Sequence, residues 1–422
     1  MSSTIEVAPS APTFDELFRP LDLAFIADPY PSLNRLRELY PVVQEGTGRW
    51  LLSRYADISG VNRNPQARRI GPNGVTAAIP WFNLEQYPNA SAQIRDSLFL
   101  RDGDDHARLR TLVGKAFTPR SLERLYALIR PVIARLLDEA EAAGPTVDVT
   151  ATFAAEFAVR AIQALFDLPE SDYAFYRGVA DRGVSAINPY LTPEELQKLD
   201  RYTATTAAHI EALIVYRGAH PGEDLISQLA IVEEQGDRLT LRELVALTVQ
   251  IMGGAISTAH DALGLAVLSL ARFPDEFRRV VADPTLAKSA FEETLRFDGN
   301  GQIIERNLHE DMVFQGVRVP RGAKVASLLG AGNRDPEVFA DPDRYDVARF
   351  RDPSTPQILT FGHGPHYCLG RPMALIEGQV LIEELARRYT AIELAFAPAF
   401  RPSLNPRSLA RLEVALVPRA DG

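Results

Sequence analysis

The sequence predicts a mainly α-helical protein, because it contains long amphipathic segments and one very long apolar helix. Helical spacing of apolar residues runs almost unbroken through three segments: 119–141, 153–168 and 193–217. A capping box from Thr240 to Glu243 opens a further helix, which meets no break before Pro274. About thirty residues at 1.5 Å each make a rod of roughly 45 Å. Since this rod is apolar on most sides, we expect it to lie at the centre of the core.

The N-terminal part predicts short elements followed by an irregular stretch. We expect about residues 1–13 to form a disordered tail, because they are small and polar. Residues 42–52 predict a β-hairpin, and 55–61 a short helix. From about 68 to 100 the pattern dissolves into glycine, proline and aromatic residues. A stretch of this kind favours a substrate-covering loop, with local disorder as the alternative.

Composition excludes several classes of protein. Lys plus Arg is 45 and Asp plus Glu is 55, so the net charge is -10 with no basic run, which argues against a nucleic-acid partner. The first residues have neither the apolar core of a signal peptide nor a membrane anchor, and the apolar stretch 244–270 is interrupted by Gln250, His260 and Asp261. We therefore expect a cytoplasmic monomer that makes no membrane contact, built as one domain over residues 1–422.

The only cysteine, Cys368, lies in the sequence FGHGPHYCLG, residues 361–370. Glycines on both sides permit left-handed backbone or close approach by another group, and an amphipathic helix is predicted directly after the loop. At a helix N-terminus, free N–H groups stabilise a thiolate, the form that binds metals. An inert, buried cysteine is the alternative. A dinucleotide loop is excluded, because Tyr367 stands where the third glycine would be.

This loop resembles the haem-binding loop of the cytochromes P-450. Its five matching positions spell FxxGxHxCxG: Phe361, Gly364, His366, Cys368 and Gly370. The resemblance continues in order from about residue 28 to residue 418. It implies a helical prism with a small β-rich region, a long central distal helix and a cysteine-ligand loop. It also implies haem b as the cofactor, with Cys368 as the axial ligand of its iron.

Further residues match the family's haem contacts. His106 and Arg110 lie four apart on the predicted helix 104–117, and the resemblance gives both to the haem propionates. Arg306 and His366 match the remaining propionate ligands, while Phe361 and Gly254 match positions against the haem. Without the resemblance, a histidine and an arginine four residues apart indicate only a solvated helix face.

The centre of the long helix departs from the family pattern. The family has a small residue, glycine, any residue, an acid and threonine, and this chain has Gly254, Ala255, Ile256, Ser257 and Thr258. The threonine is kept and the acid is replaced by serine, which can pass a proton but cannot supply one near neutral pH. Three explanations remain open. The substrate or a trapped water completes the proton relay; Asp261 substitutes; or the chemistry needs less proton delivery, as in radical coupling or nitric oxide reduction. A serine bonded to its own helix backbone is the structural alternative.

Glu293 and Arg296 form an ExxR pattern, which alone indicates a surface ion pair. In the family this pair joins a later arginine, matched here by Arg349, in a buried triad behind the haem. A buried set of charges survives only when it is fully paired. We therefore predict that the three residues are structural and hold the loop that carries Cys368.

The predicted substrate pocket combines the long helix, the lid and a strand. Gly253 and Gly254 together are costly in mid-helix, which suggests that a large group passes close by. Gln250 lies one turn earlier and would orient the substrate, and Gln302 and Ile303 would line the pocket. Trp81 and Phe82 lie in the lid. These features favour a sizeable natural-product intermediate of secondary-metabolite or antibiotic biosynthesis, either free or bound to a carrier protein.

The resemblance implies a haem-thiolate monooxygenase that uses dioxygen for hydroxylation, epoxidation or oxidative coupling. Its electrons would come from NAD(P)H through a separate ferredoxin or flavodoxin, because the chain has no flavin or nucleotide motif. Two alternatives are a nitric oxide reductase, which the missing acid favours, and a non-enzymatic haem sensor, which Thr258 argues against. No HExxH pattern supports a metal hydrolase.

Overall fold

The structure is a computed structural model that describes residues 11–72, 85–117, 119–181, 192–234 and 236–419. Residues 1–10 of the disordered tail predicted for about residues 1–13 therefore lie outside the described residues, as do Trp81 and Phe82 of the predicted lid. Beyond the tail, Thr13 already caps the first helix, because its hydroxyl accepts the N–H of Glu16.

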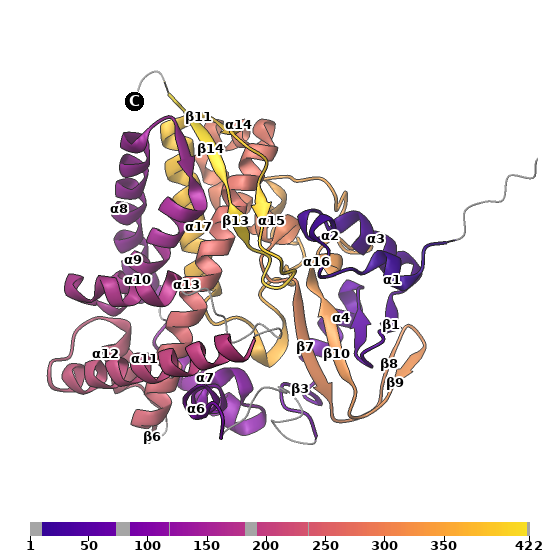
Figure 1. Cartoon of the computed structure of the whole chain (residues 1–422), viewed down its shortest axis with the longest axis horizontal. Coiled ribbons are helices and arrows are strands. Elements are labelled where there is room, and N and C mark those ends of the chain that lie inside the picture. Colours follow the sequence, from indigo (N-terminus) through magenta and orange to yellow (C-terminus); the bar gives the residue numbers. More distant parts are fainter. Residues whose placement is uncertain (1–10, 73–84, 118, 182–191, 235, 420–422) are drawn as a thin grey trace, which may run out of the picture.

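Helices make up most of the described chain, and the longest of them runs through its middle (Figure 1). They are α1 (Phe14–Leu17), α2 (Leu23–Ala27), α3 (Tyr30–Leu39), α4 (Tyr55–Arg63), α6 (Pro88–Asp96), α7 (Gly103–Gly114), α8 (Pro119–Ala143), α9 (Ala155–Phe166), α10 (Tyr173–Asp181), α11 (Pro193–Ala219), α12 (Leu225–Ile231), α13 (Leu241–Arg272), α14 (Pro274–Ala282), α15 (Ala287–Asp298), α16 (Leu329–Gly332) and α17 (Arg371–Arg388). The mainly α prediction is confirmed.

The strands form a small, separate β-rich region beside α1 to α4, with a second sheet near the C-terminus (Figure 1). The larger sheet has the order β1-β2-β10-β7-β3, from Val42–Gln44, Trp50–Leu52, Lys324–Leu328, Ile303–Leu308 and Ala67–Arg68. The second has the order β11-β14-β4, from Tyr389–Leu394, Glu413–Pro418 and Thr146–Asp148. Three two-stranded ribbons pair β5 (Glu233–Glu234) with β6 (Asp237–Arg238), β8 (Met312–Phe314) with β9 (Val317–Val319), and β12 (Ala399–Phe400) with β13 (Leu409–Arg411).

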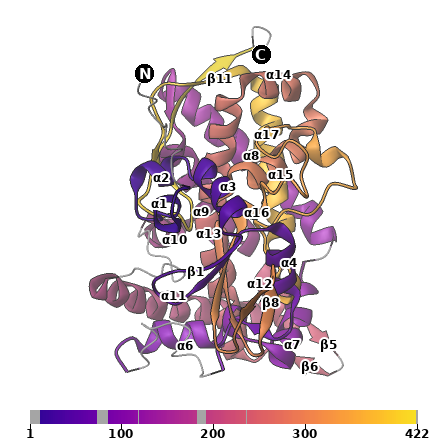
Figure 2. The ribbon, with the colours of Figure 1, turned by 90° about the vertical axis from the view of Figure 1, so that its right-hand side faces the viewer.

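Helix α13 is the central element. It begins at the predicted capping box, in which Thr240 and Glu243 bond each other's backbone N–H groups. Its C-terminal half packs into the main hydrophobic core, while α11 runs across its N-terminal half (Figure 2). By length and composition, α13 and the helical stretch Val149–Phe166 could each span a membrane, but both are mostly buried inside the protein, as core helices are.

One predicted segment differs from the structure. The irregular stretch at 68–100 contains helix α6 and a short 3₁₀ turn, Leu98–Leu100, so the pattern was wrong for its second half. Tertiary contacts explain the difference, because Gln93 bonds the carbonyl of Ala246 and the N–H of Leu98 bonds Gln250, both on α13.

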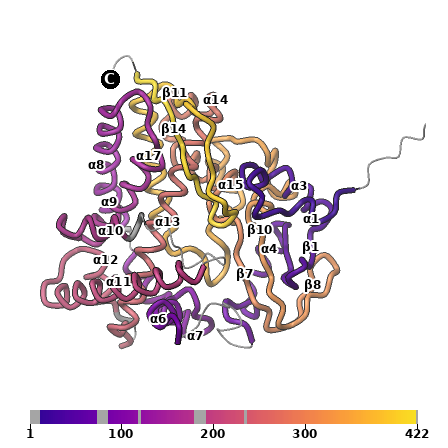
Figure 3. The backbone as a smooth tube through the Cα atoms, viewed as in Figure 1, coloured from indigo at the N-terminus to yellow at the C-terminus, as the bar shows by residue number. Residues whose placement is uncertain are grey.

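The C-terminal strands pack against α13 and α14 at the end of the chain (Figure 3).

Candidate haem site

The loop before α17 folds back so that its cysteine faces a helix start. The N–H of Cys368 donates to the carbonyl of Phe361 at 2.9 Å, which closes the loop. Gly364 has a φ of +73°, and a Cβ there would lie 2.2 Å from the carbonyl oxygen of Asn62 on α4. Only glycine therefore allows the loop to approach α4 so closely. Phe361 packs half-buried at the edge of the main core.

The charge state of Cys368 results from opposing influences. Burial raises the pKa of the thiol, whereas the N–H groups of Gly370 and Arg371 and the charge of Arg110 lower it. Burial prevails, so in the absence of a metal the pKa of the Cys368 thiol lies above its usual value, and the thiolate form stays a prediction for the protein with its cofactor. The helix start and Arg110 reduce the cost of a thiolate, and a metal cation on the sulfur would supply the remaining stabilisation.

The four predicted propionate ligands lie together beside this loop. The ring centroids of His106 on α7 and His366 in the loop are 4.1 Å apart. Arg306 on β7 is 2% exposed, and its Nε and the Nε2 of His106 are buried without a hydrogen-bond partner among the described residues. Arg110 carries a charge close enough to Cys368 to affect its pKa. Such unpaired buried donors are rare in proteins, and they fit the two carboxylates of a haem.

Electrostatics also indicate an anionic ligand. Burial, reinforced by nearby positive charge, lowers the pKa of Arg306 to about 9. Burial and the charges of His366 and Arg110 lower the pKa of His106 to about 4. Both shifts disfavour positive charge, and a bound carboxylate would reverse them. The residues present therefore fit the cofactor that the resemblance implies.

The middle of α13 leaves an open face above the loop. Gly253, Gly254 and Thr258 are exposed, although the helix around them is buried, and a Cβ on either glycine would meet no atom of the described residues within 4 Å. Ser257 donates its hydroxyl to the carbonyl of Gly253 at 3.0 Å, and Thr258 donates to Gly254 at 2.6 Å. The space beside these mid-helix glycines is open, and the passage of a large group there stays a prediction.

Comparisons with known proteins agree with this site. A family model for cytochrome P450 matches residues 194–395. The epothilone C/D epoxidase of Sorangium cellulosum is 31% identical over 421 residues, which cover 97% of each chain. This chain belongs to the cytochrome P450 family. It is also 30% identical to the polyketide biosynthesis cytochrome P450 PksS of Bacillus subtilis (strain 168) over 414 residues, which cover 95% of this chain and 98% of that one.

Among solved structures, P450BioI in complex with hexadec-9Z-enoic acid ligated acyl carrier protein superposes with a TM-score of 0.84. It is 28% identical, and the match covers 93% of this chain and 99% of that chain. CalO2 superposes with a TM-score of 0.85 at 29% identity, covering 95% and 99%. The cytochrome P450 fold is therefore confirmed, and the family implies haem, dioxygen, monooxygenase activity and a redox partner.

In this P450 the structure brings the ExxR residues and Arg349 together. Arg296 donates to both carboxylate oxygens of Glu293, at 2.7 and 2.8 Å, and Nε of Arg349 lies 3.1 Å from both. Glu293 and Arg296 are fully buried. The remaining guanidinium donors bond backbone carbonyls, including those of Asn333 and Ala340, so the triad is fully paired.

The acid candidate Asp261 already has partners. It is 6% exposed, accepts the hydroxyl of Ser408 at 2.6 Å and lies 3.0 Å from Nδ1 of His260. Helical spacing places it on the face of Gly254, two turns along α13. Ser257, one turn before Asp261, has the backbone bond of the structural alternative.

The predicted pocket residues take different positions. Gln250 is half-buried and uses its Oε1 to accept the N–H of Leu98. Gln302 is 2% exposed, and its amide nitrogen bonds the carbonyl of Gly299 and the hydroxyl of Tyr30. The amide of Gln302 therefore stabilises the interior of the protein. The sequence pattern predicted a pocket residue because it does not reveal these buried acceptors. Ile303 begins β7 and is half-buried.

Two residues near the propionate ligands were missed by sequence reasoning. Arg69 follows β3, whose pairing with β7 brings it beside Arg306. Asp102 precedes α7, and its carboxylate accepts the N–H groups of Arg69 and Ile70 and lies 3.1 Å from Nε2 of His366. Burial raises the pKa of Asp102, but these bonds outweigh it and hold the pKa below its usual range. No motif marks either residue, because their proximity depends on strand pairing.

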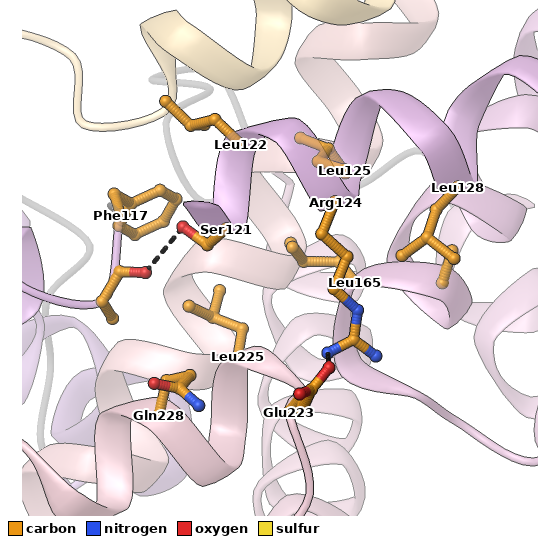
Figure 4. Close-up of a pocket in the computed structure, with 12 residues that line it drawn as sticks. Phe117, Ser121, Leu122, Arg124, Leu125, Leu128, Leu165, Glu223, Leu225 and Gln228 are labelled. Carbon is orange, nitrogen blue, oxygen red and sulfur yellow. Dashed lines mark hydrogen bonds and ion pairs between the residues drawn. The ribbon is translucent and has the colours of Figure 1, made fainter. Parts of the chain in front are cut away.

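Away from this site, a small cavity of about 30 Å³ lies between α8, α9 and α12 (Figure 4). Arg124 and Glu223 form an ion pair at its edge, and Leu125, Leu165 and Leu225 line it. This volume holds about one or two water molecules and is far too small for an organic substrate.

Proposed function

We propose that this P450 oxidises a sizeable intermediate of secondary-metabolite biosynthesis by hydroxylation, epoxidation or oxidative coupling. The observation that carries the proposal is the open face at Gly253 and Gly254, over a loop whose cysteine matches the haem ligand. The relatives named for epothilone epoxidation and polyketide biosynthesis support this substrate class. Haem, when bound, supplies dioxygen activation. The chain binds the haem, leaves space for the substrate and organises water beside it.

Each residue at the site has a proposed part. Cys368 binds the iron through its sulfur, and the N–H groups of Gly370 and Arg371 stabilise the thiolate. His106, Arg110 and Arg306 bind the haem carboxylates. His366 belongs to this set as well, with its Nε2 held by Asp102 and only Nδ1 left for a second partner.

Thr258 organises water on the distal side in this proposal. Its hydroxyl bonds the carbonyl of Gly254 but remains exposed on the open face, so its oxygen can still accept a hydrogen bond from water. Ser257 is committed to its own helix, and Asp261 to Ser408. This arrangement favours the substrate or a trapped water as the group that completes the proton relay.

The electrons would come from NAD(P)H through a ferredoxin or flavodoxin, in the cytoplasm, to a monomeric enzyme. Two arginines that could receive an acidic redox partner, Arg371 and Arg108, are already paired. Arg371 bonds Glu292, and Arg108 forms ion pairs with Asp237 and Glu243. An acidic donor would have to compete with these carboxylates. A carrier-bound substrate remains part of the proposal, because P450BioI has been solved with a ligated carrier protein.

A nitric oxide reductase of the same fold is the second candidate, and Ser257 in the acid position favours it. Such an enzyme takes electrons directly from NADH. Turnover with NADH and nitric oxide in the absence of any ferredoxin would support this candidate, and dependence on a ferredoxin would exclude it.

A spectral titration of the ferric protein against natural-product scaffolds tests the proposed substrate class. We expect at least one scaffold to change the spin state of the iron with saturable affinity. Carrier-tethered forms of the same scaffolds form the second arm, because a tethered substrate can bind when the free molecule does not. If no free or tethered scaffold changes the spectrum of a protein that holds haem, the proposed substrate class is wrong.

A further inference from the structure

Two buried guanidinium groups, Arg69 and Arg306, share a single backbone acceptor. Nη1 of Arg69 donates to the carbonyl of Glu305 at 3.0 Å, and Nη1 of Arg306 donates to the same oxygen at 2.9 Å. We propose that Arg69 joins Arg306 in a two-guanidinium receptor for one carboxylate of the cofactor. This inference rests on the haem assignment above and adds a binding residue that no motif in the sequence indicates.

Charge repulsion makes this arrangement costly without an anion. Two donors on one oxygen hold the like-charged guanidiniums close together. Within the described residues, neither group forms an ion pair within 4.0 Å, and the Nε of each is buried without an acceptor. Burial and the charge of Arg69 lower the pKa of Arg306, and burial lowers the pKa of Arg69 to about 10. A carboxylate would satisfy both groups.

The nearby acids do not supply this neutralisation. The charge of Glu305 acts on Arg69, but its carboxylate forms an ion pair with Arg49. Asp102 faces the cluster, but its oxygens accept the N–H groups of Arg69 and Ile70 and contact Nε2 of His366. It therefore fixes the backbone of Arg69 and orients His366, and it makes no ion pair with the side chain of Arg69 or Arg306. The excess positive charge of the cluster remains available to an external carboxylate.

Arg69 is held in place before any ligand binds. Its guanidinium stacks on the ring of Phe99, with the central carbon 3.8 Å from the ring centroid. Its carbonyl accepts the side-chain N–H of Asn307, on the same strand as Arg306, at 2.8 Å. Because these contacts fix both ends of the residue, little side-chain entropy is lost when a carboxylate binds.

Haem retention and reduction potential of the holoenzyme test the proposal. Arg69→Gln is compared with Arg69→Lys, with Arg306→Gln, and with Arg68→Gln as the matched control. Arg68 is the adjacent residue, and its side chain donates at an exposed position to the carbonyl of Pro65. The readouts are the rate of haem transfer to an excess of apomyoglobin and the reduction potential of the iron.

We expect Arg69→Gln to lose haem about tenfold faster or more, the size of one charge-assisted hydrogen bond. Its potential should fall, because an unneutralised carboxylate favours the ferric iron, and Arg69→Lys should restore most of the potential. Arg68→Gln should match the parent in both. The proposal is overturned if Arg69→Gln matches Arg68→Gln. It is also overturned if Arg69→Gln only weakens the binding of carboxylate-bearing substrates, since Arg69 then belongs to the substrate site.

Haem dimethyl ester separates a ligand role from a folding role. Its propionates are neutral methyl esters that form no ion pair, so the parent and Arg69→Gln should release the diester at equal rates. A variant that releases the diester faster than the parent has a damaged fold, and the Arg69 receptor is then rejected. A parent that holds no haem at all would instead refute the proposed function.

Discussion

At the residue level, the distal face combines a retained threonine with a serine that bonds its own helix. The hydroxyls of Ser257 and Thr258 both donate to carbonyls one turn earlier, but only Thr258 is exposed on the open face. The hydroxyl proton of a serine in this geometry is already used in a hydrogen bond to its own helix backbone, so it is not available to a proton relay. The two adjacent residues therefore have separable effects.

Replacing these two hydroxyls one at a time should separate their roles. Ser257→Ala should change substrate turnover and hydrogen peroxide leakage by less than about twofold, and stability by less than about 0.5 kcal/mol. Thr258→Ala should raise the leakage, because water is no longer organised on that side. Peroxide released per NAD(P)H consumed is the measurement. Equal leakage in both variants would contradict the assignment.

At the level of elements, the structure shows how α15 is joined to the segment around Arg349. The triad links α15 to the segment around Arg349, and its two innermost members are fully buried. A buried charge that loses its partner is much more costly than an exposed one. The position of the Arg349 segment relative to α15 therefore depends on these side chains, and we predict that the cysteine loop depends on this segment in turn.

Glu293→Gln should destabilise the protein by about 3–5 kcal/mol and reduce its haem content, because two guanidiniums lose their counter-charge. Denaturant unfolding and haem per chain are the measurements. Arg278→Gln is the control, since Arg278 and Asp275 form an ion pair whose side chains are 64% and 83% exposed, and no measurable loss is expected. If Glu293→Gln retains full haem and stability, the triad is not structural.

Sequence patterns predicted the local elements well and the long-range contacts poorly. The capping box at Thr240 and the hairpin ending at Leu52 depend on residues close in the chain, and both are as predicted. Arg69 reaches Arg306 only through the pairing of β3 with β7, which no local pattern encodes. Gln302 looked like a pocket residue because its buried acceptors, Gly299 and Tyr30, could not be seen from sequence.

At the level of the whole molecule, stability depends on buried acids with opposite behaviour on one helix. Glu377 on α17 is 2% exposed, and burial raises its pKa from 4.5 to about 8. Glu384 on the same helix is 3% exposed, but bonds from Arg387 and Arg130 outweigh burial and lower its pKa. In the folded chain, burial therefore favours the protonated form of Glu377, whereas the two arginines favour the ionised form of Glu384.

The pH dependence of unfolding should change in Glu377→Gln. The folded chain holds a proton that the unfolded chain releases between pH 4.5 and about 8, so the parent loses stability as pH rises through this window. The loss is at most about 1.4 kcal/mol per pH unit. Glu377→Gln should remove this slope and raise Tm mainly at the alkaline end. Glu384→Gln should instead lower Tm at neutral pH. Parallel Tm profiles for the parent and Glu377→Gln would contradict this account.

The carbon monoxide spectrum of the reduced protein tests the central claim, that Cys368 holds haem iron through its sulfur. The parent should show the red-shifted band of a thiolate-ligated haem, and Cys368→Ser should lose this band even where it retains haem. His106→Ala, a change at the carboxylate cluster, should keep the band at lower haem content. If the parent holds haem but gives the same carbon monoxide spectrum as Cys368→Ser, Cys368 is not the ligand and the assigned site is wrong.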